Sequence, residues 1–229
     1  MIFKVSKACY RLGLRAGAIV FRGIETGASS PELSGEIEKE VRRIQARYED
    51  SKLVRTLEEI KVLHDILRSV GVNPRRTQPS NQRLLEMACQ KGVLPSINSL
   101  VDTYNLISIQ TRASMGAHDL GSLSLPVSLT KTTGEESFVP LGMTEEQPVP
   151  AGEFGYVDAD NRMICRLDVR QANFSKVTAS SRDVLLIIEA NTAFTEEAIR
   201  QTFDTSISQI TSICGGEAEI VWYPEPVET

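Results

Sequence analysis

The chain has 229 residues, of which 41% are hydrophobic and 24% are charged, and its formal net charge is −5 at pH 7. This composition can supply a full core, which argues against disorder and fits one large domain or a domain with an extension. No apolar run approaches the roughly 18 residues that span a bilayer, and the N-terminus does not look like a signal peptide, so we expect a cytoplasmic protein with no membrane partner.

The four cysteines, at positions 9, 89, 165 and 214, lie far apart and form no Cys-x-x-Cys pair. That spacing encodes neither a zinc knuckle nor a redox pair. We therefore predict no metal and no cofactor, and we expect four reduced, buried thiols.

Basic and acidic residues are divided unevenly along the chain. Residues 1–112 hold 18 Lys and Arg against 12 Asp and Glu, a balance of +6, whereas residues 113–229 hold 7 against 18, a balance of −11. A basic half can mark a nucleic-acid surface. The candidate phosphate contacts are Arg42, Arg43, Arg75, Arg76, Arg83 and, from the acidic half, Arg170. For Arg42 and Arg43, ion pairs with glutamates of the same helix are the favoured alternative, and Arg170 has the alternative of pairing with the acidic half.

The first part of the chain predicts two strands followed by helices. Small residues and a proline separate the two groups, and Gly71 and Pro74 form a helix stop signal. The predicted elements are strands over 3–10 and 14–24, helices over 31–50 and 52–70, and a third helix with Ser80 as its N-cap.

Residues 94–111 predict one amphipathic helix whose polar face consists of Asn98, Asp102 and Asn105. Asn and Asp are poorer helix formers than Glu or Lys, so this stripe indicates hydrogen bonds to neighbouring loop backbone more than solvation. Two alternatives stay open. The face is merely solvated, or Asp102 or Asn105 contacts a ligand, because short polar groups beside a sheet edge suit an amino-acid ammonium group.

After residue 111 the pattern changes to β-structure. Hairpins are predicted over 122–142 and 152–169, each around a short polar turn. Residues 183–190 are apolar on both faces, which is typical of a central strand. A helix capped by Thr195 and stopped by Gly215 and Gly216 follows, and a last strand ends near residue 223.

Four stretches in this order carry a resemblance: "LRSVGVNPRRTQPSNQRLLEMACQKGVLPSINSLVDTYNLISI", "HDLGSLSLPVSLTKTTGEESFVPLG", "DVLLIIEANTAF" and "ICGGEAEI". Together they resemble the B3/4 domain of the phenylalanyl-tRNA synthetase β subunit. The resemblance covers roughly residues 67–221. It implies a mixed α/β (α+β) fold of β-sheets packed with helices. It also divides the chain into N-terminal strands and a helical extension (1–66), the B3/4-like module (67–223) and a tail (224–229).

In the synthetase this module holds the editing pocket that hydrolyses tyrosine wrongly attached to the phenylalanine tRNA. The resemblance places Glu189 at the pocket glutamate. The pocket histidine of bacterial synthetases, three positions before the aspartate matching Asp119, is Gly116 here, and His118 lies one position before Asp119. The family's Thr-x-Ala has no clear counterpart.

Two site residues have alternatives that the sequence leaves open. Glu189 is either a buried group satisfied by backbone donors or a pocket group that faces a ligand amine or water. His118 and Asp119 are either a base with its orienting carboxylate or, the favoured alternative, part of a solvated loop.

We therefore expect a stand-alone module that binds tRNA or aminoacyl-tRNA without activating an amino acid, since the chain shows no Gly-rich nucleotide loop and no synthetase active-site domain. A second hypothesis is a trans-acting deacylase of misacylated tRNA, in which Glu189 positions the substrate amine while water attacks the ester. A third is a binder of an amino-acid-like small molecule.

Overall fold

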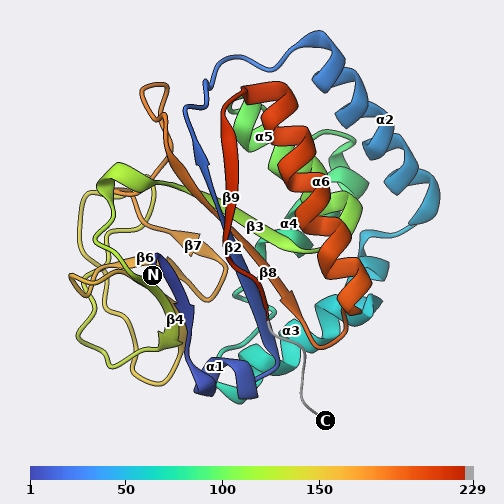
Figure 1. Ribbon diagram of the computed structural model, residues 1–229. Helices are drawn as coiled ribbons and strands as arrows, with labels where there is room; N and C mark the ends of the chain where they lie inside the picture. The colour runs from blue at the N-terminus through green and yellow to red at the C-terminus, as the bar shows by residue number, and fades with distance from the viewer. Residues whose placement is uncertain (225–229) are drawn as a thin grey trace.

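Two β-sheets stacked face to face form the centre of the molecule, and helices cover the outer face of one of them (Figure 1). The structure is a computed structural model, and it describes residues 1–224. The predicted mixed α+β fold is confirmed. Of the predicted tail, only Pro224 is described, and the rest lies outside the described residues. No helix within residues 1–224 is long and apolar enough to cross a membrane.

The sheet under the helices is antiparallel and has four strands in the described chain. Their order is β3 (Ser114–Asp119), β8 (Val184–Asn191), β2 (Leu14–Arg22) and β9 (Glu217–Trp222). Successive side chains of the central strand β8 point into two different apolar environments. Leu185 and Ile187 face the other sheet, whereas Leu186 and Ile188 face the helices. Burial on both faces explains its continuous apolar sequence and confirms the predicted central strand.

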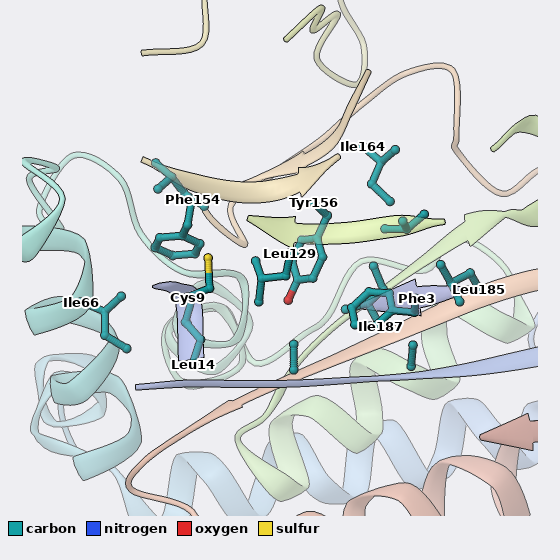
Figure 2. Close-up of a cluster of buried hydrophobic side chains, with 14 of the residues drawn as sticks. Phe3, Cys9, Leu14, Ile66, Leu129, Phe154, Tyr156, Ile164, Leu185 and Ile187 are labelled. Atoms are coloured by element: carbon teal, nitrogen blue, oxygen red, sulfur yellow. The ribbon is translucent and has the colours of Figure 1, made fainter. Parts of the chain in front are cut away.

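The second sheet has five short strands among the described residues. They follow the order β1 (Phe3–Val5), β4 (Val127–Lys131), β5 (Phe154–Val157), β6 (Met163–Arg166) and β7 (Arg170–Gln171). Aromatic residues of this sheet, including Phe3, Phe154 and Tyr156, belong to one apolar cluster with Leu185 and Ile187 of the other sheet (Figure 2). The main apolar core therefore lies between the two sheets.

Two helices, α5 (Ser99–Thr111) and α6 (Glu196–Cys214), cover the outer face of the four-stranded sheet. The contact of α6 with β2 is close, because a Cβ added to Gly17 would lie 2.2 Å from Cζ of Phe203. As predicted, Thr195 caps α6 by accepting a hydrogen bond from Ala198 N, and Gly215 ends the helix.

The remaining helices form an outer layer. A third apolar cluster joins α2 (Pro31–Arg47), the 3₁₀ helix η1 (Ser51–Thr56) and α4 (Ser80–Lys91) to α5. Helix α3 (Glu58–Ser69) instead packs its apolar face, including Leu63 and Ile66, on the core between the sheets. The short helices α1 (Lys7–Arg11) and η2 (Leu120–Ser122) lie in connections.

Three predicted N-terminal elements differ from the structure. The strand predicted over 3–10 ends at Val5, because Ser6 accepts a hydrogen bond from Cys9 N and begins α1. The helix predicted over 52–70 is divided at Leu57, whose backbone is extended (φ −62°, ψ 136°). The N-cap of α4 is Pro79 rather than Ser80, which is the first helical residue.

The hairpin predicted over 122–142 is wrong, whereas the hairpin over 152–169 is confirmed as β5 and β6. Strand β4 pairs with β1 and β5. The carboxylate of Glu136 accepts from Thr133 N and Gly134 N. The predicted second strand makes two isolated bridges instead, from Ser137 to Arg162 and from Pro140 to Ala172. The Glu136 side chain thus satisfies backbone N–H groups of the turn, and the predicted second strand does not pair with β4.

The first 66 residues contribute to both sheets. Strand β1 pairs with β4. Strand β2 pairs with β8 over Leu14–Phe21 and with β9 over Ala18–Arg22. Whether residues 67–223 form a separate module stays a prediction, but the two parts share their sheets.

Candidate functional site

A pocket of about 410 Å³ opens beside β3, at the edge of the four-stranded sheet. Helices α4 and α5 contribute one set of lining residues, β3 contributes another, and the segment from β6 to β7 contributes a third. Its apolar lining includes Leu84, Met87, Val101, Met115, Leu141 and Val169, and its polar lining includes Ser80, Arg83, Asn105, His118, Asp168, Arg170 and Gln171.

A larger hollow of about 790 Å³ lies at the N-terminus of α6. None of the site residues predicted from the sequence lines it. The pocket beside β3 instead brings together four of them, Arg83, Asn105, His118 and Arg170, with Gly116. We therefore treat this pocket as the candidate site.

Asn98 and Asp102 do not line the pocket beside β3. Asn98 is the N-cap of α5 and accepts a hydrogen bond from Val101 N (2.9 Å), so the helix begins at Ser99 rather than at residue 94. Asp102 is 2% exposed and accepts hydrogen bonds from Ser29 Oγ, Ser96 Oγ and Ile97 N at 2.6 to 2.9 Å. It borders only a small hollow between α2 and α5. Asn98 thus caps its own helix, and Asp102 ties the segments around Ser29 and Ser96 to α5.

Asn105 differs from its two neighbours in the stripe. It is buried, it lines the pocket, and its side chain forms no hydrogen bond with the described residues. Of the three residues, Asn105 is therefore the one with hydrogen-bonding groups available to a ligand.

The solvated loop predicted around His118 is wrong, since the residue is 2% exposed on strand β3. Its Nδ1 lies 2.9 Å from Ser175 Oγ and 3.3 Å from Gln171 Nε2. Burial lowers the pKa of His118 to about 3, so the imidazole is neutral at neutral pH. The Nε2 atom of His118 lies 4.0 Å from the position that a Cβ atom added to Gly116 would occupy.

Asp119 follows His118 in the sequence, but its side chain makes a different contact. Its carboxylate accepts a hydrogen bond from the Ser181 hydroxyl and makes none with His118. Successive strand residues point to opposite faces, so the two side chains do not form a base with its orienting carboxylate.

Glu189 lies on β8 and faces the space between the sheets. It is 2% exposed, its Oε2 accepts a hydrogen bond from the Tyr156 hydroxyl, and its Oε1 has no partner among the described residues. Burial raises the pKa of Glu189 to about 7. Glu189 does not line the pocket, so of its two alternatives the structure favours the buried group, with a tyrosine hydroxyl rather than backbone donors as its partner.

A second carboxyl group, Asp168, lines the pocket and was not singled out from the sequence. Leu167 and Asp168 both have left-handed backbone (φ 57° and 55°), which turns the chain between β6 and β7. Ser80 Oγ donates to Asp168 Oδ2 at 3.4 Å. Burial and the nearby Glu189 carboxylate raise the pKa of Asp168 well above its usual value. A lone aspartate between apolar neighbours gives no sequence signal for this position.

The pocket contains no activated thiol. Cys165 lines it, but burial raises the pKa of that thiol well above its usual value, so it is protonated and a poor nucleophile at neutral pH. The cysteines at 9, 89, 165 and 214 are all free. Within residues 1–224, no group of three or more His, Cys, Asp or Glu side chains is arranged to hold a metal ion.

The candidate phosphate contacts fall into two groups. Arg42 and Arg43 pair with Glu38 and Glu40 of their own helix, at 3.5 and 3.1 Å, as the favoured alternative predicted. The other four are exposed and have no carboxylate within 4.0 Å in the described chain: Arg75, Arg76, Arg83 and Arg170.

A family model described as the B3/4 domain matches residues 63–210. No curated protein matches the chain. One similar solved structure is an N-terminal fragment of the phenylalanyl-tRNA synthetase β subunit from Pyrococcus horikoshii, with a TM-score of 0.52 and 11% identity. The match covers 98% of this chain and 54% of that fragment, so the chain spans about half of the fragment's length. At this identity the likeness shows the fold alone.

Proposed function

Because the chain belongs to the B3/4 domain family, we propose that it binds tRNA or an aminoacyl-tRNA. The sequence resemblance to this family is confirmed, and it supplies the context for the ligand. The observation that carries the proposal is the contrast between two arginines paired on α2 and two arginines that line the pocket without a carboxylate partner.

Arg83 and Arg170 line the pocket, yet neither has a carboxylate partner, whereas Arg42 and Arg43 are neutralised on their own helix. An exposed guanidinium without an intramolecular partner is available to a phosphate. Arg75 and Arg76 extend this set along the segment that leads into α4. In the proposed complex, RNA phosphates contact these four residues and the aminoacyl end enters the pocket.

Binding of tRNA at low and moderate salt tests the proposal in matched variants. In a filter or gel retention assay, affinity should fall as salt rises, because phosphate contacts release counterions. The double variant Arg83→Gln with Arg170→Gln should bind more weakly, with a salt slope reduced by about 2. The control, Arg42→Gln with Arg43→Gln, removes the same charge and should behave as the parent protein.

Two results would contradict the proposal. One is that no tRNA is retained even at low salt. The other is that the two double variants weaken binding equally, which would mean that net charge rather than the pocket rim decides affinity.

Ester hydrolysis is a second candidate, supported by the polar groups of Asp168 and Asn105 inside the pocket. With a protonated thiol at Cys165, such chemistry would rest on positioning the ester for attack by water. The same preparations should be incubated with tyrosyl-tRNA and other misacylated tRNAs, and ester loss compared with binding. Binding without ester loss would leave the binding proposal and remove the deacylase.

A further inference from the structure

The larger hollow, at the start of α6, contains a buried cation. Arg15 on β2 is 7% exposed and lines this hollow of about 790 Å³. No carboxylate lies within 4.0 Å of its guanidinium group in the part of the chain that the structure describes. A buried charge is ordinarily paired, because its removal from water is costly unless a counter-ion or hydrogen bonds offset it. Arg15 is therefore a position where an anion would be stabilised.

The hydrogen bonds of Arg15 use only one of its two terminal nitrogens. Nη1 donates to the carbonyl oxygens of Tyr10 (3.0 Å) and Leu14 (2.9 Å), and Cζ lies 3.9 Å from the centre of the Tyr10 ring. Neither Nε nor Nη2 donates to a described residue. Those two groups form the edge through which a guanidinium binds a phosphate or carboxylate with two parallel hydrogen bonds. The side chain is thus held in place with that edge unused.

The first turn of α6 lines the same hollow and has unused donors. Thr195 Oγ1 accepts from Ala198 N, but the backbone N–H groups of Glu196 and Glu197 have no acceptor among residues 1–224. The hydroxyl of Thr192, another lining residue, forms no hydrogen bond with the described residues. Figure 1 shows this turn at the end of the molecule where β8 ends. The start of a 19-residue helix attracts anions through its free N–H groups and its dipole.

Two carboxylates at this hollow oppose an anion. Glu197 pairs with Arg200 and accepts from Gln201 Nε2 at 2.6 Å, so its charge is already engaged. Glu196 is exposed and has no cation within 4.0 Å in the described chain. A ligand anion must therefore gain enough hydrogen bonds at Arg15 and the helix start to offset the repulsion from Glu196. A phosphate monoester has three strong acceptor oxygens for these donors, whereas a carboxylate has two.

An apolar wall completes the hollow. Phe194, Ile199, Tyr223 and Pro224 line it. The Tyr223 ring packs on the ring of Phe203 with centroids 5.0 Å apart, yet Tyr223 remains 39% exposed. An aromatic ring that is held from one side and open on the other can stack with a flat group of a ligand.

We propose that this hollow binds a phosphate monoester joined to a flat ring, and that nucleoside monophosphates are the ligand class. The phosphate lies at Nε and Nη2 of Arg15, where the start of α6 also favours it, and the base lies on the wall that includes Phe194 and Tyr223. The site is separate from the pocket beside β3, since Arg83 and Arg170 do not line the hollow.

The probes are AMP and UMP and their parent nucleosides, which keep the ring and lose the phosphate. Calorimetry on the full chain should detect binding of the nucleotides and at least about tenfold weaker binding of adenosine and uridine. Inorganic phosphate should compete with AMP. Equal binding of nucleotide and nucleoside, or no binding of either nucleotide, would overturn the proposal.

The position of the phosphate is tested with three single variants. Arg15→Lys keeps the positive charge but loses the planar fork, so it should bind AMP at least about tenfold more weakly. Glu196→Gln removes the opposing charge and should bind AMP about two- to fivefold more tightly. The control Glu135→Gln makes the same change of charge at an exposed residue outside the hollow and should bind AMP as the parent protein does.

Two further results decide where AMP binds. The double variant Arg83→Gln with Arg170→Gln should keep the parent affinity for AMP, and a loss there would place the nucleotide in the pocket beside β3 and overturn the proposal. If Arg15→Lys does not fold, the nucleoside comparison and Glu196→Gln decide the question. Equal affinities of Glu196→Gln and Glu135→Gln for AMP would contradict a phosphate at this hollow.

Discussion

Burial shifts the pKa values of two side chains on the neighbouring strands β8 and β3 in opposite directions. It disfavours the charged form of each, which raises the pKa of Glu189 to about 7 and lowers that of His118 to about 3. At neutral pH the histidine is an uncharged hydrogen-bonding group, while the glutamate is near its titration midpoint. A proton exchange at this site is therefore possible through the glutamate and not through the histidine.

These shifts predict opposite contributions to stability between about pH 4.5 and pH 6.5. The native state keeps the proton of Glu189 that the unfolded state loses, so this group's contribution is full below about pH 4.5 and is lost as pH rises through about 7. His118 contributes fully above about pH 6.5, and its contribution is lost as pH falls toward about 3.

Two variants separate the contributions. Glu189→Gln should make the free energy of unfolding rise more steeply from pH 4.5 to pH 6.5 than in the parent protein, and His118→Gln should make it rise less steeply or fall. Urea denaturation across this range measures both, with the exposed change Glu219→Gln on β9 as control. Parallel pH profiles for all four proteins would contradict the assigned burial effects.

At the scale of single elements, helix α5 shows how one stripe of similar residues divides its roles. Asn98 caps the helix, Asp102 accepts three hydrogen bonds from other segments, and Asn105 faces the pocket without a partner. Three residues that share one helical stripe thus have three different environments, because different segments pack against each turn.

Substitution of each residue of the stripe by alanine should lower the free energy of unfolding by a different amount. Asp102→Ala should cost about 1–3 kcal/mol because it leaves buried donors unpaired, and Asn98→Ala should cost about 1 kcal/mol as the loss of a cap. Asn105→Ala should cost little, because the side chain forms no hydrogen bond within the described residues that the change could remove. Free energies of unfolding from urea titrations check the order, and a loss at Asn105 as large as that at Asp102 would contradict it.

At the scale of the whole molecule, the N-terminal segment is part of both sheets. Strand β2 lies between β8 and β9, and β1 extends the other sheet beside β4. Removing these strands would expose the apolar face of β8 and leave its backbone groups without partners.

We therefore expect a fragment of residues 67–223 not to fold on its own. Its circular dichroism and urea titration should show no cooperative transition, whereas the full chain should unfold in one. Adding a separately produced 1–66 peptide should restore structure if strand pairing is the missing contribution. A cooperative transition in the isolated fragment would instead support the predicted division at residue 66.

The local sequence pattern was sufficient to predict those elements whose environment is uniform along their length. The apolar run of β8, the caps of α6 and the 3.6-residue spacing of α2 each report burial or termination within a few neighbouring residues. The order of the motifs also predicted the family. Strand β3, by contrast, has a glycine in its middle and no clear alternation, and it is a strand because β8 offers its edge.

The chemistry of the site depended on which segments meet. Asp168 and Glu189 are 21 positions apart in the sequence. Asp168 lies in the turn between two strands of one sheet and Glu189 on a strand of the other, so only stacking of the sheets brings their charges together. Short-range periodicity and motif order were enough to predict helices α2, α4 and α6, the central strand and the family, because that information lies within neighbouring residues. Tertiary structure alone decided that Arg83 and Arg170 stay unpaired at the pocket while Glu189 is buried behind Asp168. Ion pairing and desolvation depend on distances between segments that no local pattern encodes.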